Sequence, residues 1–123
     1  MTSAVTMTEQ TVRVIVERQV RRVDLGPLDF VPPGEGRAYV VNGLTIAVFR
    51  QRDNRLFATD NQCPHRSGPL ADGIVGGGKV ICPLHAWKFD LETGRCLGEN
   101  VAIRTYPVQV VGGHIVVEVG PAS

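Results

Sequence analysis

Apolar and polar positions alternate along this chain in short segments that are separated by turns rich in glycine and proline. A period of two indicates half-buried β-strands. The first segment alternates Val12, Val14 and Val16 with polar residues, and we read the charged stretch 17–24 as its continuation toward Val23. No stretch combines the periodicity and the caps of a helix. The pattern therefore predicts an all-β fold of antiparallel sheet layers.

Three segments predict hairpins because two strand patterns flank a tight turn. Residues 37–50 form two such patterns around Asn42-Gly43, the strongest two-residue hairpin signal. Residues 74–81 turn at three consecutive glycines, and residues 106–119 turn at a glycine pair. Pro107 has no N–H to donate, so we expect its strand at a sheet edge or with that position turned outward.

Size and charge narrow the class of protein further. A chain of 123 residues is one domain large enough for its own core. With 13 basic and 12 acidic residues, the net charge of +1 predicts neither a nucleic-acid partner nor a membrane surface. No apolar run approaches the length of a membrane span, and the N-terminus has no secretory signal pattern. Three cysteines do not make a paired disulfide framework, so we expect a reduced, cytoplasmic protein.

Two short motifs carry the candidate chemistry. Cys63-Pro64-His65 and Cys82-Pro83-Leu84-His85 each pair one cysteine with one histidine. Such a set can hold a 2Fe–2S cluster, with both thiolates on one iron and both imidazoles on the other. Zinc also accepts two cysteines and two histidines, but a zinc finger usually groups its cysteines together and its histidines together. The alternation favours the iron–sulfur cluster, and a zinc-stabilised interaction module without redox activity remains as an alternative.

The ligand loops and their surroundings resemble the Rieske iron–sulfur family. The stretches CPHRSGPLADG and GKVICPLHAWKFDLETGRCLG carry the resemblance, which extends over most of residues 20–119. It implies a Rieske fold and one 2Fe–2S cluster. In that cluster Cys63 and Cys82 would bind the buried iron, and His65 and His85 would bind the outer iron.

The organisation expected from this resemblance has three parts. Residues 1–10 form a flexible N-terminal tail, and residues 11–123 form the Rieske domain. Because the ligand loops fall between predicted strands, residues from about 60 to 97 form a small cluster-binding subdomain on the main sheet layers. Cys96, within it, has no histidine nearby in sequence and is expected to be a structural thiol.

The loops also differ from those of high-potential members of the family. Those members carry a disulfide between the loops, at the positions of Gly68 and Leu84. They also place a serine and a tyrosine, which donate hydrogen bonds to the cluster, where this chain has Trp87 and Phe89. Such donors stabilise the reduced cluster and raise its potential. The resemblance therefore implies a potential near the low end of the Rieske range, with Trp87 and Phe89 as apolar packing.

Within the family, the chain most resembles the small subunit of NAD(P)H-dependent assimilatory nitrite reductase. The resemblance is carried by residues 69–75, 82–85, 89–94 and 103–108. It implies a large partner subunit with flavin, iron–sulfur and sirohaem groups that reduces nitrite to ammonium. The main alternative is a soluble Rieske ferredoxin of an aromatic-ring dioxygenase system. The sequence shows no nucleophile–base pair or phosphate-binding loop, so either role is that of a non-catalytic electron-transfer component.

Overall fold

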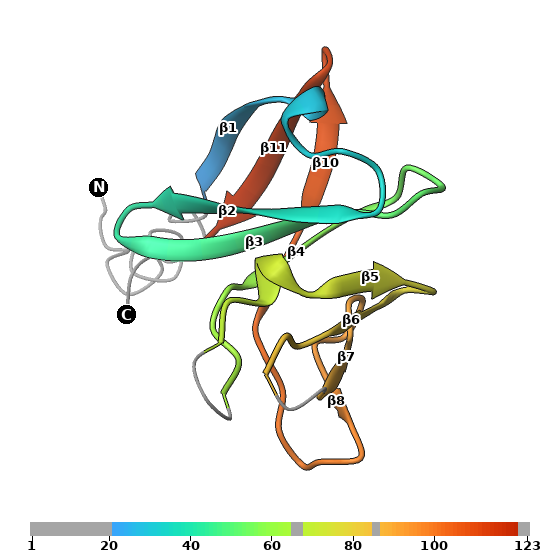
Figure 1. Ribbon diagram of the computed structural model, residues 1–123. Coiled ribbons are helices and arrows are strands. Elements are labelled where there is room, and N and C mark those ends of the chain that lie inside the picture. Colours follow the sequence, from blue (N-terminus) through green and yellow to red (C-terminus); the bar gives the residue numbers. More distant parts are fainter. Residues whose placement is uncertain (1–20, 65–67, 85–86, 121–123) are drawn as a thin grey trace, which may run out of the picture.

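The computed structural model describes residues 21–64, 68–84 and 87–120, and Figure 1 shows their arrangement. The predicted tail at residues 1–10, the strand predicted at 12–16, and the two histidines His65 and His85 lie outside these ranges.

The described chain forms three antiparallel sheets, in agreement with the predicted all-β class. The first sheet has the order β1-β11-β10 and consists of β1 (Arg21–Pro27), β11 (His114–Val119) and β10 (Val108–Val111). The second, called the basal sheet below, has the order β2-β3-β4-β9 and consists of β2 (Glu35–Val41), β3 (Leu44–Arg50), β4 (Leu56–Asp60) and β9 (Thr105–Tyr106). The third has the order β5-β6-β7-β8 and consists of β5 (Ile74–Gly76), β6 (Lys79–Ile81), β7 (Lys88–Asp90) and β8 (Cys96–Leu97). Two single 3₁₀ turns, η1 (Leu28–Phe30) and η2 (Leu70–Asp72), join the strands.

The three predicted hairpins are confirmed. The β2–β3 turn places Asn42 at φ 52° and Gly43 at φ 80°, the left-handed pair that a two-residue hairpin needs to match the strand twist. The glycine runs of the β5–β6 and β10–β11 turns also contain residues with positive φ. Local turn chemistry therefore fixes these connections.

Pro107 divides the strand that the pattern at 106–110 predicted to be continuous. Tyr106, in β9, pairs with Ala58 of the basal sheet, whereas Val108 begins β10 and pairs with β11. The proline has no N–H for either ladder, so the chain changes sheets at this residue. β10 lies at the edge of its sheet, as expected, and Val110 is exposed.

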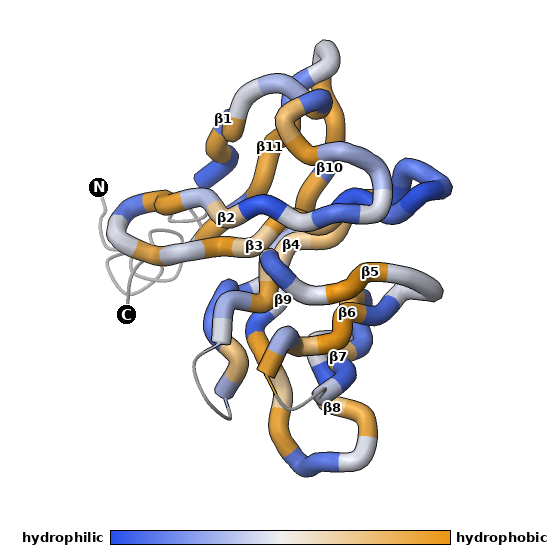
Figure 2. Tube along the Cα trace, in the orientation of Figure 1, coloured by the Kyte–Doolittle hydropathy of each residue, from blue (hydrophilic) through white to orange (hydrophobic). Residues whose placement is uncertain are grey.

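Two buried clusters form the interior. One lies between the first sheet and the basal sheet and consists of Val31, Val41, Ile46, Val48, Ala58, Tyr106, Ile115, Val117 and Val119. The other joins the basal sheet to the third sheet and consists of Ala47, Phe49, Cys63, Leu70, Ala71, Val80, Cys82, Phe89, Leu91, Cys96 and Ile103. Figure 2 shows both as hydrophobic stretches along the inner strands. The second cluster contains all three cysteines of the chain.

Tyr106 closes the far edge of the basal sheet with a side-chain hydrogen bond. Its hydroxyl donates to Asp60 Oδ1 over 2.6 Å. Burial, reinforced by this hydrogen bond to a carboxylate, raises the pKa of Tyr106 to about 12. The folded protein therefore holds the phenolic proton more tightly than the unfolded chain, in which the pKa is near 10.0. This contribution to stability is complete below about pH 10 and is lost as the pH rises toward 12.

We expect Tyr106→Phe to lower the free energy of unfolding by about 1 kcal/mol at pH 8, the usual net value of one hydrogen bond. The loss should shrink by pH 11, and urea unfolding at the two pH values measures it. Tyr39→Phe is a matched control, because the buried Tyr39 hydroxyl has no hydrogen-bond partner within the described ranges. Its removal should be nearly neutral. An equal loss of unfolding free energy for Tyr106→Phe at both pH values would contradict the pH dependence expected from the raised pKa of Tyr106.

Candidate metal centre

The two cysteine motifs lie on loops with the same backbone closure. Cys63 follows β4, and its N–H donates to the carbonyl of Gly68 over 2.9 Å. Cys82 follows β6 directly, and its N–H donates to the carbonyl of Trp87 over 2.7 Å. Each bond spans the same number of residues, from 63 to 68 and from 82 to 87. The sequence thus builds two equivalent loops, each of which begins at a cysteine followed by a proline that restricts the backbone.

Both cysteine side chains point into the protein. Cys63 is 1% exposed and Cys82 is 2% exposed, and neither forms a disulfide. They belong to one buried cluster together with the apolar side chains of Phe89 and Leu91. The structure therefore brings together Cys63 and Cys82, which belong to two different predicted loops. Their sulfur atoms are free and lie in an apolar environment.

The electrostatics of this pair suit a cationic metal. Burial raises the pKa of the Cys82 thiol; a hydrogen bond from the Leu84 backbone lowers it, and the neighbouring Cys63 thiol raises it again. A buried thiol such as that of Cys82 keeps its proton unless a positive charge stabilises the thiolate. Iron supplies that charge, so two inward-facing sulfur donors fit one iron of a 2Fe–2S cluster.

The two loops touch each other at Gly68 and Leu84. A Cβ atom on Gly68 would lie 3.0 Å from Leu84 Cδ1 and 3.5 Å from Cys82 Sγ. These are the two positions at which the family resemblance places the disulfide of high-potential members. In this chain the loops meet there through an apolar contact, and Leu84 remains 43% exposed.

Aromatic packing supports the second loop. Phe89 is fully buried, and the ring of Trp87 packs against the same core with its centroid 6.5 Å from that of Phe89. The rings are tilted by 52°. The prediction that these two residues serve as apolar packing is confirmed.

Cys96 is the third thiol of this core. It is 7% exposed, pairs with Phe89 across the β7–β8 ladder, and forms no disulfide. Burial raises the pKa of its thiol, and the Glu99 charge raises it further. A protonated, enclosed thiol matches the structural role predicted for Cys96.

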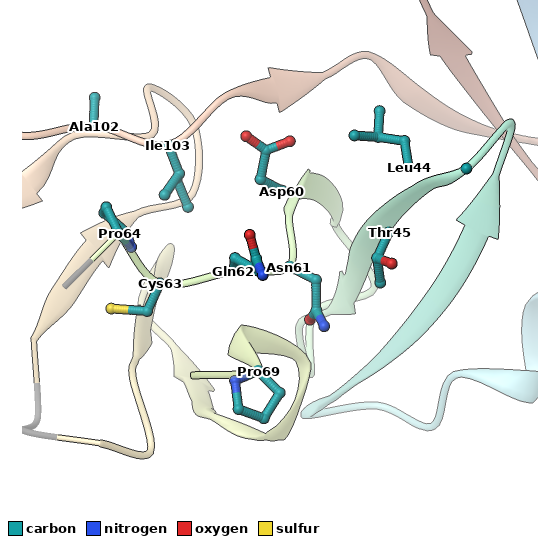
Figure 3. A pocket seen from close by; sticks show the side chains of 11 residues that line it. Leu44, Thr45, Asp60, Asn61, Gln62, Cys63, Pro64, Pro69, Ala102 and Ile103 are labelled. Carbon is teal, nitrogen blue, oxygen red and sulfur yellow. The ribbon is translucent and has the colours of Figure 1, made fainter. Parts of the chain in front are cut away.

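A cavity of about 740 Å³ opens beside the first ligand loop. It lies between the β2–β3 turn and the segment that contains Cys63, as Figure 3 shows. Its lining residues are Gly43, Leu44, Thr45, Asp60, Asn61, Gln62, Cys63, Pro64, Pro69, Ala102 and Ile103. Asn61 lines the side of the cavity nearer Thr45, and the sequence patterns did not single out this residue.

Within residues 21–64, 68–84 and 87–120, no group of three or more His, Cys, Asp or Glu side chains is placed so that it could hold a metal ion. Among the same residues, no helix is long and apolar enough to cross a membrane. The predicted histidine ligands, His65 and His85, belong to the part of the chain that the structure does not describe.

The family comparison covers nearly all of the described chain. A sequence profile described as a Rieske-like 2Fe-2S domain matches residues 23–118. Among curated proteins, the anthranilate 1,2-dioxygenase ferredoxin subunit of Burkholderia cepacia is 39% identical over 98 residues, which cover 78% of this chain and 90% of that protein. The ferredoxin component of the naphthalene 1,2-dioxygenase/salicylate 5-hydroxylase systems of a Ralstonia species is 37% identical over 90 residues, covering 72% and 86%.

Solved structures give a second kind of match. A Mycobacterium tuberculosis protein assigned as the small subunit of an NADH-dependent nitrite reductase superimposes with a TM-score of 0.77 at 29% identity. That match covers 84% of this chain and 98% of the other. A ferredoxin of Sphingomonas yanoikuyae B1 superimposes with a TM-score of 0.71 at 32% identity, covering 80% and 98%.

Proposed function

Because the chain belongs to the family of Rieske-like 2Fe-2S domains and carries one such cluster, we propose that Cys63, His65, Cys82 and His85 are its ligands. The observation that carries this proposal is the pair of buried, free cysteines on two equivalently closed loops. The bound cluster supplies one-electron oxidation and reduction. The loop backbones hold the sulfur donors, and the apolar core around them excludes water. The protein is therefore a Rieske electron-transfer protein.

We further propose that it serves as the small subunit of an assimilatory NAD(P)H nitrite reductase in the cytoplasm. The fold match to the M. tuberculosis small subunit supports this role, since it covers more of this chain than the ferredoxin match does. A second solved structure, assigned as an NADPH nitrite reductase small subunit, also superimposes, with a TM-score of 0.72 at 27% identity. In this role the chain passes single electrons to a large subunit with flavin and sirohaem groups, where nitrite is reduced to ammonium.

A second candidate is a soluble ferredoxin that carries electrons from a reductase to a ring-hydroxylating dioxygenase. The curated relatives support it, because ferredoxin components are 37% and 39% identical and are covered over 86% and 90% of their length. The two roles differ in the partner, which is a permanent subunit in the first and a transient one in the second.

The absorption spectrum of the complex captured from native cells under anaerobic conditions separates the two roles. For the nitrite reductase subunit we expect sirohaem bands beside the broad iron–sulfur envelope, at a fixed ratio of the two chains. Nitrite turnover by that complex is the confirming assay. An iron–sulfur spectrum without sirohaem, together with reduction by a flavin reductase and oxidation by a Rieske oxygenase, would contradict the first role and favour the second.

A further inference from the structure

Each ligand loop is attached to the basal sheet by one side-chain amide, and the two amides lie at opposite ends of that sheet. Gln51 directly follows β3, and Asn61 directly follows β4. Because β3 and β4 are antiparallel, the ends at which these residues stand are on opposite sides of the sheet. Figure 1 shows the β5–β6 hairpin reaching toward the β3–β4 turn at one side and the first ligand loop descending from β4 at the other.

Asn61 holds the segment in which the first ligand loop ends. Its side-chain oxygen accepts a hydrogen bond from the Ala71 N–H over 2.9 Å, and its main-chain carbonyl accepts one from the Leu70 N–H over 2.7 Å. Its own N–H donates to the Thr45 carbonyl of β3 over 3.2 Å. The 3₁₀ turn η2, which follows the loop, is thereby fixed to two strands of the basal sheet through a single residue.

Gln51 holds the strand that leads into the second ligand loop. Its side-chain oxygen accepts a hydrogen bond from the N–H of Gly78, the residue before β6, and β6 runs directly into Cys82. Its side-chain nitrogen donates to Asp53 Oδ1 over 3.1 Å. Gln51 as a whole is only 5% exposed, so the polar atoms of its side chain need these partners. The Gly78 carbonyl is engaged as well, by the Leu91 N–H over 2.8 Å.

We propose that Asn61 and Gln51 are positioning residues of the cluster site, which set the separation and orientation of Cys63 and Cys82 from the two ends of the basal sheet. Among the described residues, the two loops meet at the Gly68–Leu84 contact and at the neighbouring Cys63 and Cys82 thiols, and no disulfide joins them. Their relative position therefore depends on what each loop is fixed to. A fixed frame also limits the rearrangement of the ligands when the charge of the cluster changes by one electron. This inference rests on the ligand assignment proposed above.

The test uses substitutions that keep shape and remove hydrogen bonding, Asn61→Leu and Gln51→Met, in the protein with its cluster. Hydrogen exchange of the Ala71 and Gly78 amides reports the two attachments. The linewidth of the electron paramagnetic resonance signal of the reduced protein reports the spread of cluster geometries. Loss of one hydrogen bond should speed exchange of the corresponding amide about fivefold to tenfold, and each variant should broaden the resonance. Asn61→Asp keeps the acceptor oxygen and should restore slow exchange of the Ala71 amide and narrow lines.

Ile115→Val is the matched control, because Ile115 is fully buried in the core cluster that does not contain Cys63, Leu70, Ala71 or Cys82. It should lower the unfolding temperature without changing the linewidth. Faster amide exchange with an unchanged linewidth would overturn the inference, as would equal broadening in Ile115→Val. A wild-type protein without the reduced-cluster resonance would instead contradict the ligand assignment itself, and the exchange rates would still identify the two attachments.

Discussion

Replacing any one of Cys63, His65, Cys82 or His85 with alanine should abolish or severely destabilise the cluster. The buried sulfur atoms of the two cysteines cannot be replaced by solvent, and an iron that loses one imidazole becomes open to water and hydrolysis. Iron and acid-labile sulfide per chain, together with the visible absorption spectrum, measure the loss. We expect nearly complete loss in the cysteine variants.

Cys96→Ala is the internal control for this experiment. Cys96 lies in the same buried core and differs from the ligands in its position on a strand instead of a loop. Its replacement should leave the cluster content unchanged. Equal loss of the cluster in Cys96→Ala would contradict the ligand assignment, and zinc in place of iron in the wild-type protein would favour the interaction module.

Gly73→Ala should be among the most destabilising single-methyl additions in this fold. Gly73 has an ordinary φ of −77°, so the backbone itself tolerates alanine. A Cβ atom there, however, would lie 2.3 Å from the carbonyl oxygen of Ile81 and 2.9 Å from a methyl of Val80. The carbonyl belongs to β6, which is paired on both sides and ends immediately before Cys82. We expect the free energy of unfolding to fall by about 3 kcal/mol, at the upper end of the usual cost of overpacking. We also expect the second ligand loop to be displaced.

Gly76→Ala is a matched control on the same hairpin. No atom lies within 4 Å of a Cβ at Gly76, and this residue has no positive φ. Its effect should stay within about 0.5 kcal/mol, as for most surface substitutions. Denaturant unfolding and the rate at which a chelator removes iron compare the two variants. Equal stability and equal iron loss in both would show that β6 can yield at Ile81 without strain.

The parts of the fold that sequence patterns predicted are those decided by local chemistry. The Asn42-Gly43 turn and the glycine turns of the other hairpins need left-handed backbone angles, and these residue types supply them. At Pro107 the sequence predicted a continuous strand at a sheet edge, or one with that position turned outward, and not a break. The change of sheet between Tyr106 and Val108 depends on which strands lie on either side and is not visible in a local window.

In the candidate site, too, the sequence predicted some residues and missed others. Cys63 and Cys82 stand out because a metal ligand must be a particular residue type at a particular spacing. Gln51 and Asn61 give no such signal, since a polar residue after a strand looks like part of any turn. Their side-chain oxygens accept hydrogen bonds from the N–H groups of Gly78 and Ala71. Only the folded chain brings each oxygen close to its donor.

The attachment of the two ligand loops at opposite ends of the basal sheet also constrains electron transfer to and from the protein. If Asn61 and Gln51 fix both ligand loops to the basal sheet, the loops do not move separately between a donor and an acceptor. The whole molecule must then reorient, or change its binding partner, between the two steps. If one face around the loops serves both steps, the donor and the acceptor compete for it. Excess oxidised acceptor should then slow reduction of the protein by its donor, and stopped-flow mixing at increasing acceptor concentration measures this competition. An unchanged rate would mean that donor and acceptor approach from separate sides.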